Sequence, residues 1–421
     1  MTAPEPPLAC SPPLMRRIAL LATALLALLP ASAAAQDEEL LVKRLTAQMR
    51  FAGAYSSAYV VEVSGDAPRA IFRWRQNTPR ILASNTKLFT TSAALARFGS
   101  EGTLGTGELD AKGVYRGSLY LRGGGDPTFG SRRFTTRSYG GGATVEDLAV
   151  LLADTGITRV TGRVYGDESA FDSLRGGPDS GYGVSVWVGP LSALSFNRGL
   201  FTEGGRGFQA NPPAFAAARL DGALEARDVT VRLRPRAGVA PAGATVLASV
   251  DSPPMQRLIR LTNKPSDNFF AETLVKDLAR QTGGVGTTAR GARIAARFAR
   301  RLGARATLVD GSGLSRGNRA SPASIVRLLR AMYRRDDYDP FVDSLPIAGQ
   351  DGTLFDRMRR GPAKFRCRGK TGTLSNVSAL SGYCEATSGD NYAYSILMNG
   401  VYPTGARRLQ DRMLQAIAKY G

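Results

Sequence analysis

The chain has 421 residues, of which 43% are hydrophobic and 21% are charged, so it is long enough for more than one folded domain. It contains no histidine, which excludes a Ser-His-Asp or Cys-His triad and any zinc site with a histidine ligand. The net charge of +20 at pH 7 suits association with anionic polymers or membrane surfaces. Because no helix-turn-helix, zinc or RNP pattern accompanies this charge, we expect no nucleic-acid partner.

The first residues have the pattern of a secretory signal peptide. Residues 15–17 are Met-Arg-Arg, residues 18–29 are apolar, and residues 33–35 are three alanines that suit a cleavage site. We therefore predict a signal peptide over residues 1–35, a mature chain that starts near Gln36, and a periplasmic location. The apolar segment is short for a membrane span. An uncleaved anchor is the alternative, and we otherwise expect at most a peripheral association with the membrane.

Ser84 and Lys87 stand three residues apart at the start of a predicted helix. The residues that follow are largely apolar at helical spacing: Leu88, Phe89, Ala93, Ala94 and Phe98. Side chains three apart lie on one face of a helix, so the Lys87 amine can reach the Ser84 hydroxyl. An ammonium cannot accept a proton, so Lys87 would have to be held neutral by burial or by a neighbouring cation. This spacing predicts Ser84 as a nucleophile near the positive end of the helix and Lys87 as its base.

The long interval between Ser84 and the next motif is rich in glycine and in short strand and turn patterns. Three segments in it have the pattern of strands and one has that of a helix: residues 118–121, 159–165 and 229–233, and residues 144–153. We expect one or two inserted domains over residues 103–249. The flanking residues 37–102 and 250–421 would then form one discontinuous catalytic domain.

Two further motifs follow this interval. The run Ser266-Asp267-Asn268 precedes an apolar helical pattern, which predicts a loop or helix entry that faces a cleft. Lys370 begins a predicted strand, Lys-Thr-Gly-Thr-Leu, and residues 377–383 form the next strand. Such a strand can pair with an extended peptide and present a backbone N–H to an oxyanion. Lys370 is also a cation that could lower the pKa of Lys87.

The C-terminal part is predicted to close the catalytic domain. Residues 392–401 alternate like a strand, and residues 406–419 form a helix whose apolar side would pack on the sheet. Cys367 and Cys384 are placed symmetrically about Ser375-Asn376, so they would face each other across a hairpin. A cross-strand disulfide in an oxidising compartment and two separate buried thiols are both compatible with this arrangement.

The three motifs, in this order, are typical of penicillin-recognising serine acyl-transfer enzymes. The chain resembles the low-molecular-mass serine D-alanyl-D-alanine carboxypeptidase/endopeptidase family, penicillin-binding proteins that carry a large insertion between their first and second motifs. Six segments carry the resemblance: residues 83–88 (Ala-Ser-Asn-Thr-Lys-Leu), 123–128 (Gly-Gly-Gly-Asp-Pro-Thr), 263–268 with 271–272 (Asn-Lys-Pro-Ser-Asp-Asn with Ala-Glu), 310–316 (Asp-Gly-Ser-Gly-Leu-Ser-Arg), 345–349 with 351–354 (Leu-Pro-Ile-Ala-Gly with Asp-Gly-Thr-Leu) and 369–374 (Gly-Lys-Thr-Gly-Thr-Leu).

The resemblance implies an α/β (α+β) fold: a penicillin-recognising serine transpeptidase/β-lactamase-like catalytic domain, in which an antiparallel sheet is packed with helices, together with inserted β-rich domains. It also implies a hydrolase that needs no metal or organic cofactor. Its partners would be β-lactams and peptidoglycan stem peptides that end in D-Ala-D-Ala.

Residue roles also follow from the resemblance. Ser84 would be the acylated nucleophile and Lys87 its base. Ser266 and Asn268 would relay the leaving-group proton and hold the substrate amide.

The third motif would bind the end of the substrate. Lys370 and Thr371 would hold the terminal carboxylate, next to Gly372 and Thr373. The backbone N–H groups of Ser84 and Thr373 would form the oxyanion hole.

Asp172 and Arg316 are further candidates, for contact with the peptide side chain. A turn-capping aspartate and a solvated arginine are the structural alternatives for these two residues.

Two other functions remain open at this point. A β-lactamase requires fast deacylation, for which class A enzymes use a glutamate between the second and third motifs. Here that interval holds only Glu272, directly behind Ser266, so the peptidase is favoured. A protein that binds penicillin or cell-wall peptide without turnover is the second alternative. Endopeptidase cleavage of crosslinks is the same reaction on a larger leaving group, so the prediction includes it beside carboxypeptidase activity.

Overall fold

The computed structural model of the protein describes residues 35–65, 67–95, 101–105 and 108–421. The signal peptide predicted over residues 1–35 lies outside this part of the chain except for its last residue. Residues 35–51 are helical. In the part of the chain that the structure describes, no helix is both long and apolar enough to span a membrane.

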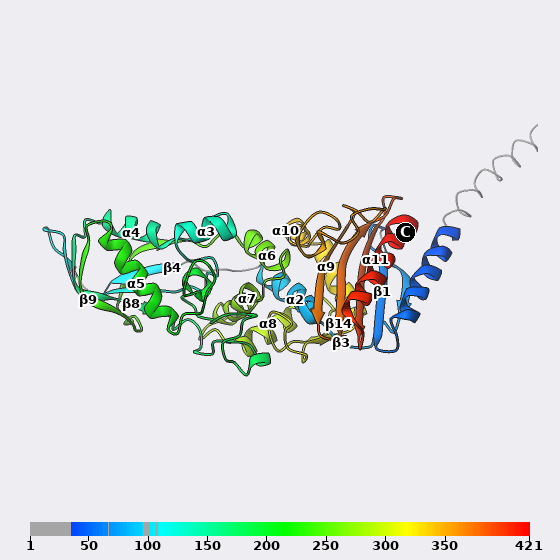
Figure 1. Ribbon diagram of the computed structural model, residues 1–421, viewed down its shortest axis with the longest axis horizontal. Coiled ribbons are helices and arrows are strands. Elements are labelled where there is room, and N and C mark those ends of the chain that lie inside the picture. The colour runs from blue at the N-terminus through cyan, green and yellow to red at the C-terminus, as the bar shows by residue number, and fades with distance from the viewer. Residues whose placement is uncertain (1–34, 66, 96–100, 106–107) are drawn as a thin grey trace, which may run out of the picture.

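A five-stranded antiparallel sheet joins the two ends of the described chain (Figure 1). Its order is β13-β14-β15-β1-β2. The strands are β1 (Ser56–Glu62), β2 (Arg69–Trp74), β13 (Cys367–Leu374), β14 (Val377–Glu385) and β15 (Asn391–Asn399). Ser57 in β1 pairs with Leu397 in β15, so the sheet requires segments from both sides of the long central interval. The strands predicted over residues 370–374, 377–383 and 392–401 correspond to β13, β14 and β15.

Helices cover both faces of this sheet because its side chains alternate between two cores. In β15, Tyr394 and Ile396 belong to a core with residues 35–51 and α11 (Pro403–Tyr420). Ala393 and Leu397 belong to the core on the opposite face. The helices of that second face are α2 (Thr86–Ala94), α7 (Asn268–Arg280), α8 (Thr288–Arg301), α9 (Pro322–Tyr333) and α10 (Tyr338–Asp343). The predicted fold class, an antiparallel sheet packed with helices, is confirmed.

Three very short strands form a separate sheet near the nucleophile motif. They are β3 (Arg80–Ile81), β11 (Ala306–Thr307) and β12 (Arg319–Ala320), in the order β11-β12-β3.

The interval between the first two motifs builds a second, seven-stranded sheet with its own core. Its strands are β4 (Glu101–Gly105), β5 (Glu108–Leu109), β6 (Val114–Arg116), β7 (Leu119–Arg122), β8 (Arg159–Asp167), β9 (Thr230–Ala237) and β10 (Thr245–Val250). Its helices are α3 (Arg132–Tyr139), α4 (Val145–Ala153) and α5 (Pro212–Glu225). The strands and helix predicted in this interval correspond to β7, β8, β9 and α4.

β8 is the centre of this inserted sheet, since β6, β7 and β9 all run parallel to it. Parallel neighbours need long crossovers, which here include α4 and α5. The chain enters the sheet at β4 and leaves it at β10, where Glu101 pairs with Val250. The domain boundaries at residues 102/103 and 249/250 stay a prediction.

The molecule is elongated, with the inserted sheet at one end and the five-stranded sheet at the other (Figure 1). Between them lie α2, α7, α8 and α6 (Met255–Asn263). Val188 and Leu191 of the insertion share a small core with Phe269 and Phe270 of α7. The insertion therefore packs directly behind the second motif.

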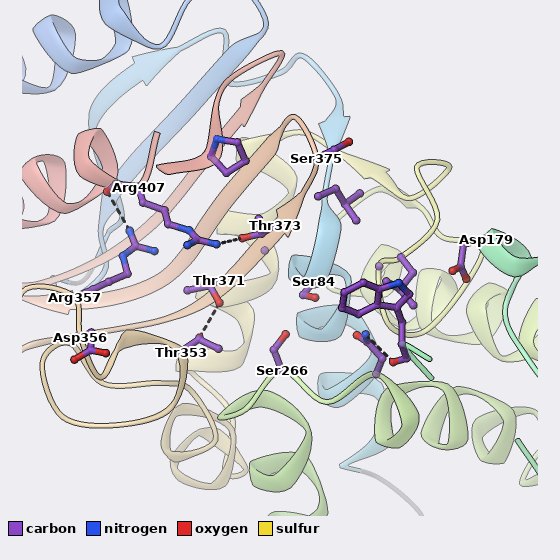
Figure 2. A pocket seen from close by; sticks show the side chains of 17 residues that line it. Ser84, Asp179, Ser266, Thr353, Asp356, Arg357, Thr371, Thr373, Ser375 and Arg407 are labelled. Atoms are coloured by element: carbon purple, nitrogen blue, oxygen red, sulfur yellow. Dashed lines mark hydrogen bonds between the residues drawn. The ribbon is translucent and has the colours of Figure 1, made fainter. Parts of the chain in front are cut away.

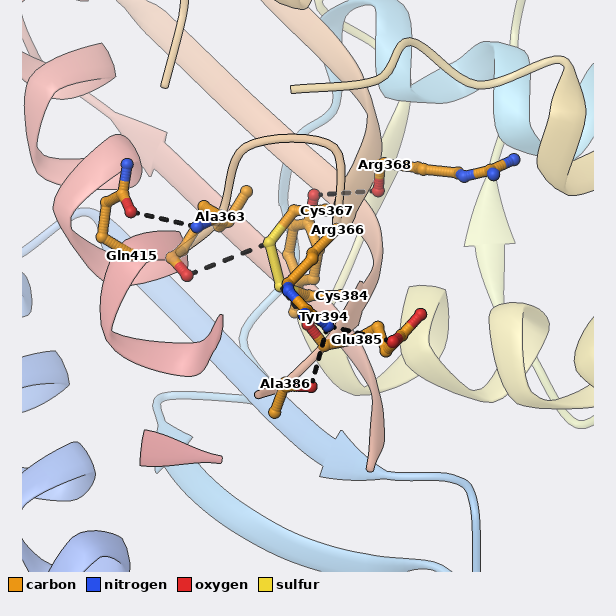
Figure 3. The surroundings of a disulfide bond; sticks show 10 residues. Ala363, Arg366, Cys367, Arg368, Cys384, Glu385, Ala386, Tyr394 and Gln415 are labelled. Atoms are coloured by element: carbon orange, nitrogen blue, oxygen red, sulfur yellow. Dashed lines mark hydrogen bonds and ion pairs between the residues drawn. A yellow bond between two sulfur atoms is a disulfide. The ribbon is translucent and has the colours of Figure 1, made fainter. Parts of the chain in front are cut away.

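A disulfide connects β13 to β14 (Figure 3). Cys367 and Cys384 are direct cross-strand partners, as their symmetry about Ser375-Asn376 predicts, and both are fully buried. Of the two hypotheses for these cysteines, the structure has the disulfide. Since β13 carries Lys370, the bond braces the strand of the third motif close to the site.

In a protein that begins at Gln36, and so lacks Cys10, we expect no thiol to be alkylated until the disulfide is reduced. Intact-mass measurement after alkylation under denaturing conditions should give two adducts with reductant and none without it. Reduction should lower the free energy of unfolding by about 2–4 kcal/mol, because the crosslink constrains the unfolded chain. Two alkylated cysteines in the unreduced protein would contradict the disulfide.

Candidate active site

Ser84 lies in a tight 3-10 turn, η1 (Ala83–Asn85), that runs directly into α2. The sequence places it at a helix N-terminus, and the structure places it in the turn that precedes one. Ala83 has φ +45°, which is unusual for a residue with a Cβ. A Cβ on Gly372 would lie 3.0 Å from Ser84 N, and one on Gly313 would lie 1.9 Å from Ala83 O. Glycine at both positions lets two other segments approach the backbone of Ala83 and Ser84 closely.

Lys87 brings three parts of the chain together. Its Nζ lies 3.1 Å from Ser84 Oγ, 2.7 Å from Asn268 Oδ1 and 2.7 Å from the carbonyl oxygen of Ser312. The side chain is completely buried. None of these three oxygens belongs to a carboxylate. Burial of the amine therefore disfavours its charged ammonium form.

The pKa of Lys87 is lowered to about 8, and burial of the amine is the largest cause. The nearby carboxylates of Asp310, Asp267 and Glu272 act in the opposite direction. Lys370 is buried as well, and its pKa is lowered well below the ordinary lysine value, first by burial and then by the charge of Lys87. Desolvation, more than the charge of Lys370, therefore prepares Lys87 to accept a proton.

The second motif forms the entry to α7. Ser266 has φ +64° and lines the cavity described below. Asp267 caps α7 by accepting the N–H of Phe270 at 3.0 Å. Asn268 is the first residue of the helix, and its two amide atoms face different partners: Oδ1 faces Lys87, and Nδ2 donates to the carbonyl of Trp187 at 3.1 Å.

The insertion also holds the second motif by an ion pair. Arg198 donates two hydrogen bonds to the Asp267 carboxylate, at 2.8 and 3.2 Å. Asn197 and Arg198 both have positive φ, +48° and +50°. Consecutive residues in this region cost free energy that the surrounding structure must supply. This strained turn positions the Arg198 guanidinium against Asp267 of the second motif.

The third motif lies on β13 next to the nucleophile. The carbonyl oxygen of Lys370 accepts a hydrogen bond from Asn85 Nδ2 at 2.8 Å, which ties the strand to the turn that carries Ser84. Lys370 Nζ lies 3.1 Å from the carbonyl oxygen of Thr371. The hydroxyls of Thr371 and Thr353 lie 2.7 Å apart. Thr371 and Thr373 alternate with buried residues along the strand, so both present their side chains to the same side.

An open cavity of about 1010 Å³ connects these groups (Figure 2). Of the residues predicted from the sequence, Ser84, Ser266, Asn268, Thr371, Gly372 and Thr373 line it. Lys87 and Lys370 lie buried beside them. The remaining lining residues are Asp179, Trp187, Gly313, Leu314, Thr353, Asp356, Arg357, Leu374, Ser375, Pro403 and Arg407. The three motifs thus converge on one cleft, and Ser84, the predicted nucleophile, lines it.

Neither of the two further candidates is among the described residues that line the cavity. Asp172 forms an ion pair with the buried Lys276 at 2.6 Å. Arg316 is exposed and donates to Asn376 Oδ1 at 2.7 Å and to Ser375 Oγ at 2.6 Å. Its guanidinium holds the β13–β14 turn, and Ser375 of that turn lines the cavity. The peptide contacts predicted for both residues stay predictions.

A pair of buried carboxylates supports the loop that contacts Lys87. Glu272 Oε1 accepts the N–H groups of Gly311 and Ser312 at 3.1 and 2.8 Å. Asp310 accepts the N–H groups of Gly313 and Ser315, each at 2.7 Å. Burial and the neighbouring Asp310 raise the pKa of Glu272 to about 7. Glu272 therefore lies behind Lys87 and is not among the described residues that line the cleft.

The sequence predictions missed several residues that line or support the cleft. Trp187 comes from a loop of the insertion, Asp179 and Arg198 come from short 3-10 turns of it, and Arg407 lies near the start of α11. No motif marks these positions. For Glu272 and Asp310, the signal was their place inside segments that carry the family resemblance.

The chain is similar to proteins of one known peptidase family. The sequence model of the D-Ala-D-Ala carboxypeptidase 3 (S13) family matches residues 39–203 and 207–420. A D-alanyl-D-alanine carboxypeptidase from Actinomadura sp. (strain R39) is 30% identical over 425 residues, covering 80% of this chain and 77% of that protein. Carboxypeptidase DacB from Mycolicibacterium smegmatis (strain ATCC 700084 / mc(2)155) is 31% identical over 363 residues, covering 81% and 76%.

The fold is shared with a solved structure. Penicillin-binding protein 4 from Haemophilus influenzae superposes with a TM-score of 0.71 at 20% identity, covering 89% of this chain and 98% of that one. The family match spans nearly all of the described residues, including all three sheets. The chain belongs to the D-Ala-D-Ala carboxypeptidase 3 (S13) family of serine peptidases.

Proposed function

We propose that the protein is a serine D-alanyl-D-alanine carboxypeptidase that acts on peptidoglycan stem peptides and is acylated by β-lactams. The observation that carries the proposal is the contact of a buried lysine of lowered pKa with the hydroxyl of Ser84, at 3.1 Å, on the floor of an open cleft. Membership of the family supports the same reaction.

Acylation begins with proton transfer from Ser84 Oγ to Lys87 Nζ. The oxygen then attacks the carbonyl of the penultimate D-Ala, and the negative charge develops on the carbonyl oxygen. The N–H groups of Ser84 and Thr373 are the proposed donors to that oxygen. The close approach of β13 to η1 at Gly372 supports this role, since it brings the two backbones together.

The leaving amine must then receive a proton. Lys87 holds the proton taken from Ser84, and Ser266 is proposed to relay it across the cleft. Asn268 would hold the substrate amide, while its own position is set by Lys87 and Trp187. The C–N bond breaks, D-alanine leaves, and water attacks the acyl-enzyme with Lys87 again as the base.

Endopeptidase activity is part of the proposal. The cleft is open and continues past the third motif to Thr353 and Arg407, so a leaving group larger than D-alanine has space. The β-lactamase alternative is disfavoured, because Glu272 is buried behind Lys87, where its Oε1 accepts two backbone N–H groups, and it is not among the described residues that line the cleft. We also propose that the protein is periplasmic, where its net charge of +20 would favour anionic cell-wall surfaces.

Brief exposure to benzylpenicillin should add one penicilloyl group, and peptide mapping should place it on Ser84. The Ser84→Ala variant should form no adduct, because the attacking oxygen is absent. The Ser388→Ala variant is a matched control, since this serine is exposed and is not among the residues that line the cavity. An adduct on another residue would contradict the assignment, and antibiotic hydrolysed without any adduct would favour a β-lactamase.

The acylation rate should depend on pH through Lys87. Only the neutral amine accepts a proton, and its pKa is lowered to about 8. The second-order rate constant should therefore rise about tenfold per pH unit below pH 8 and become constant above it. The Lys87→Ala variant should acylate about 10²–10⁴-fold more slowly and lose this dependence. A wild-type rate in this variant would exclude Lys87 as the base.

A further substitution tests the electrostatic part of this assignment. The Glu272 carboxylate raises the pKa of Lys87, so Glu272→Gln should move the inflection of the pH profile to lower pH. The amide oxygen of glutamine can still accept the two backbone N–H groups. An inflection that stays in place, with the variant folded, would show that the titrating group is not Lys87.

A further inference from the structure

The cleft extends beyond the third motif along a wall that no motif predicts (Figure 2). Ser84 lies near the middle of the view, with Asp179 on one side and Arg357 and Arg407 on the other. The second side is built by residues 353–357 and by the start of α11. Thr371 and Thr373 form its border with the reaction centre. Because the proposed carboxylate site lies at Lys370 and Thr371, this is the side of the leaving group.

Arg357 supports this wall by its contacts with α11. Its guanidinium forms an ion pair with Asp411 at 2.7 Å, and only 13% of its side chain is exposed. It also donates to Gln410 Oε1 at 3.2 Å and to the carbonyl oxygen of Arg407 at 3.3 Å. Its charge is therefore compensated, and its contacts fix the first turns of α11.

Arg407 differs from Arg357 in its charge environment. Its side chain is exposed, and Nη2 donates to Thr373 Oγ1 at 3.0 Å. Among the residues that the structure describes, it forms no ion pair with a carboxylate. Asp356 also lines this side, but its side chain is 78% exposed and faces Arg359 at 4.0 Å. An uncompensated guanidinium thus borders the cleft beside the strand that pairs with substrate.

A guanidinium suits this place better than the lysine of the motif. It stays charged at any pH that the protein encounters, and its fork geometry matches a carboxylate. Lys370 is fully buried, and burial opposes its charged form. Arg407 can therefore add an exposed positive charge next to the carboxylate site proposed at Lys370 and Thr371.

We propose that Arg407 binds the free carboxylate of the leaving-group residue and makes the enzyme select peptides that carry one. This inference rests on the proposed function, because it assigns a residue to the leaving-group side of the same reaction. The same guanidinium would serve a terminal D-alanine and a crosslink whose leaving residue keeps its carboxylate. A leaving group in which that carboxylate is replaced by a neutral amide would lose the contact.

The test uses two matched ester substrates, an acyl-D-alanyl glycolate and the corresponding acyl-D-alanyl glycolamide. Both break the same C–O bond, with the proton of Ser84 passing through Lys87 to the leaving oxygen, and they differ only in the charge of the leaving group. Wild-type enzyme should prefer the glycolate. The Arg407→Gln variant should lose about 10- to 100-fold in kcat/KM for the glycolate and little for the glycolamide.

Three comparisons make the result specific. Arg407→Lys should recover part of the preference, since it restores the charge without the fork. Arg408→Gln, an exposed neighbour on the same helix that does not line the cavity, should behave like wild type. Hydrolysis of the preformed acyl-enzyme should be unchanged in Arg407→Gln, because the leaving group has already departed.

The outcomes separate the two proposals. An equal loss for both esters would show a structural role for Arg407 and overturn the inference, as would no loss for either ester. A wild-type protein that cleaves neither ester and forms no penicilloyl adduct would instead overturn the proposed function.

Discussion

The amine of Lys87 must be kept out of water, and the rest of the site depends on this constraint. A buried amine is costly unless oxygens surround it. Its three oxygen contacts come from η1, from the first residue of α7 and from the loop after β11. No single segment can supply them, so the lysine reaches its working environment only when these parts are packed together. The proposed base therefore acquires its environment only when the tertiary structure has formed.

The insertion takes part in this packing. It contacts α7 through a small apolar core, through the Arg198–Asp267 ion pair and through the hydrogen bond from Asn268 to Trp187. Two of these three contacts involve residues of the second motif. The ion pair is partly buried, with 28% and 15% of the two side chains exposed, so solvent screens it less than a surface pair. The insertion thus supports the motif and also supplies one wall of the cleft.

The parts of the fold that sequence could predict were those with local signals. Alternating strands such as β14 and β15 and the helices α4 and α11 have strong periodicity, and the three motifs have fixed residue types. The cross-strand position of Cys367 and Cys384 followed from hairpin symmetry. Contacts that depend on long-range packing could not be derived in this way. The positive φ values at Asn197 and Arg198, the place of Arg407 beside Thr373, and the burial of Glu272 behind Lys87 arise from segments far apart in sequence.

The pairing of β1 with β15 has a consequence for the order in which the protein can fold. β1 lies between β2 and β15, and β15 ends only at Asn399, so the five-stranded sheet lacks a central strand until nearly the whole chain has been made. The inserted sheet is complete at Val250 and has its own core. During synthesis from the N-terminus, the insertion can therefore fold first. At that stage β1 can pair with β2 but still lacks its other neighbour, β15. The turn η1, which contains Ser84, then gains its neighbouring strand β13 only at a late stage. Partly synthesised chains therefore contain Ser84 but not the complete cleft.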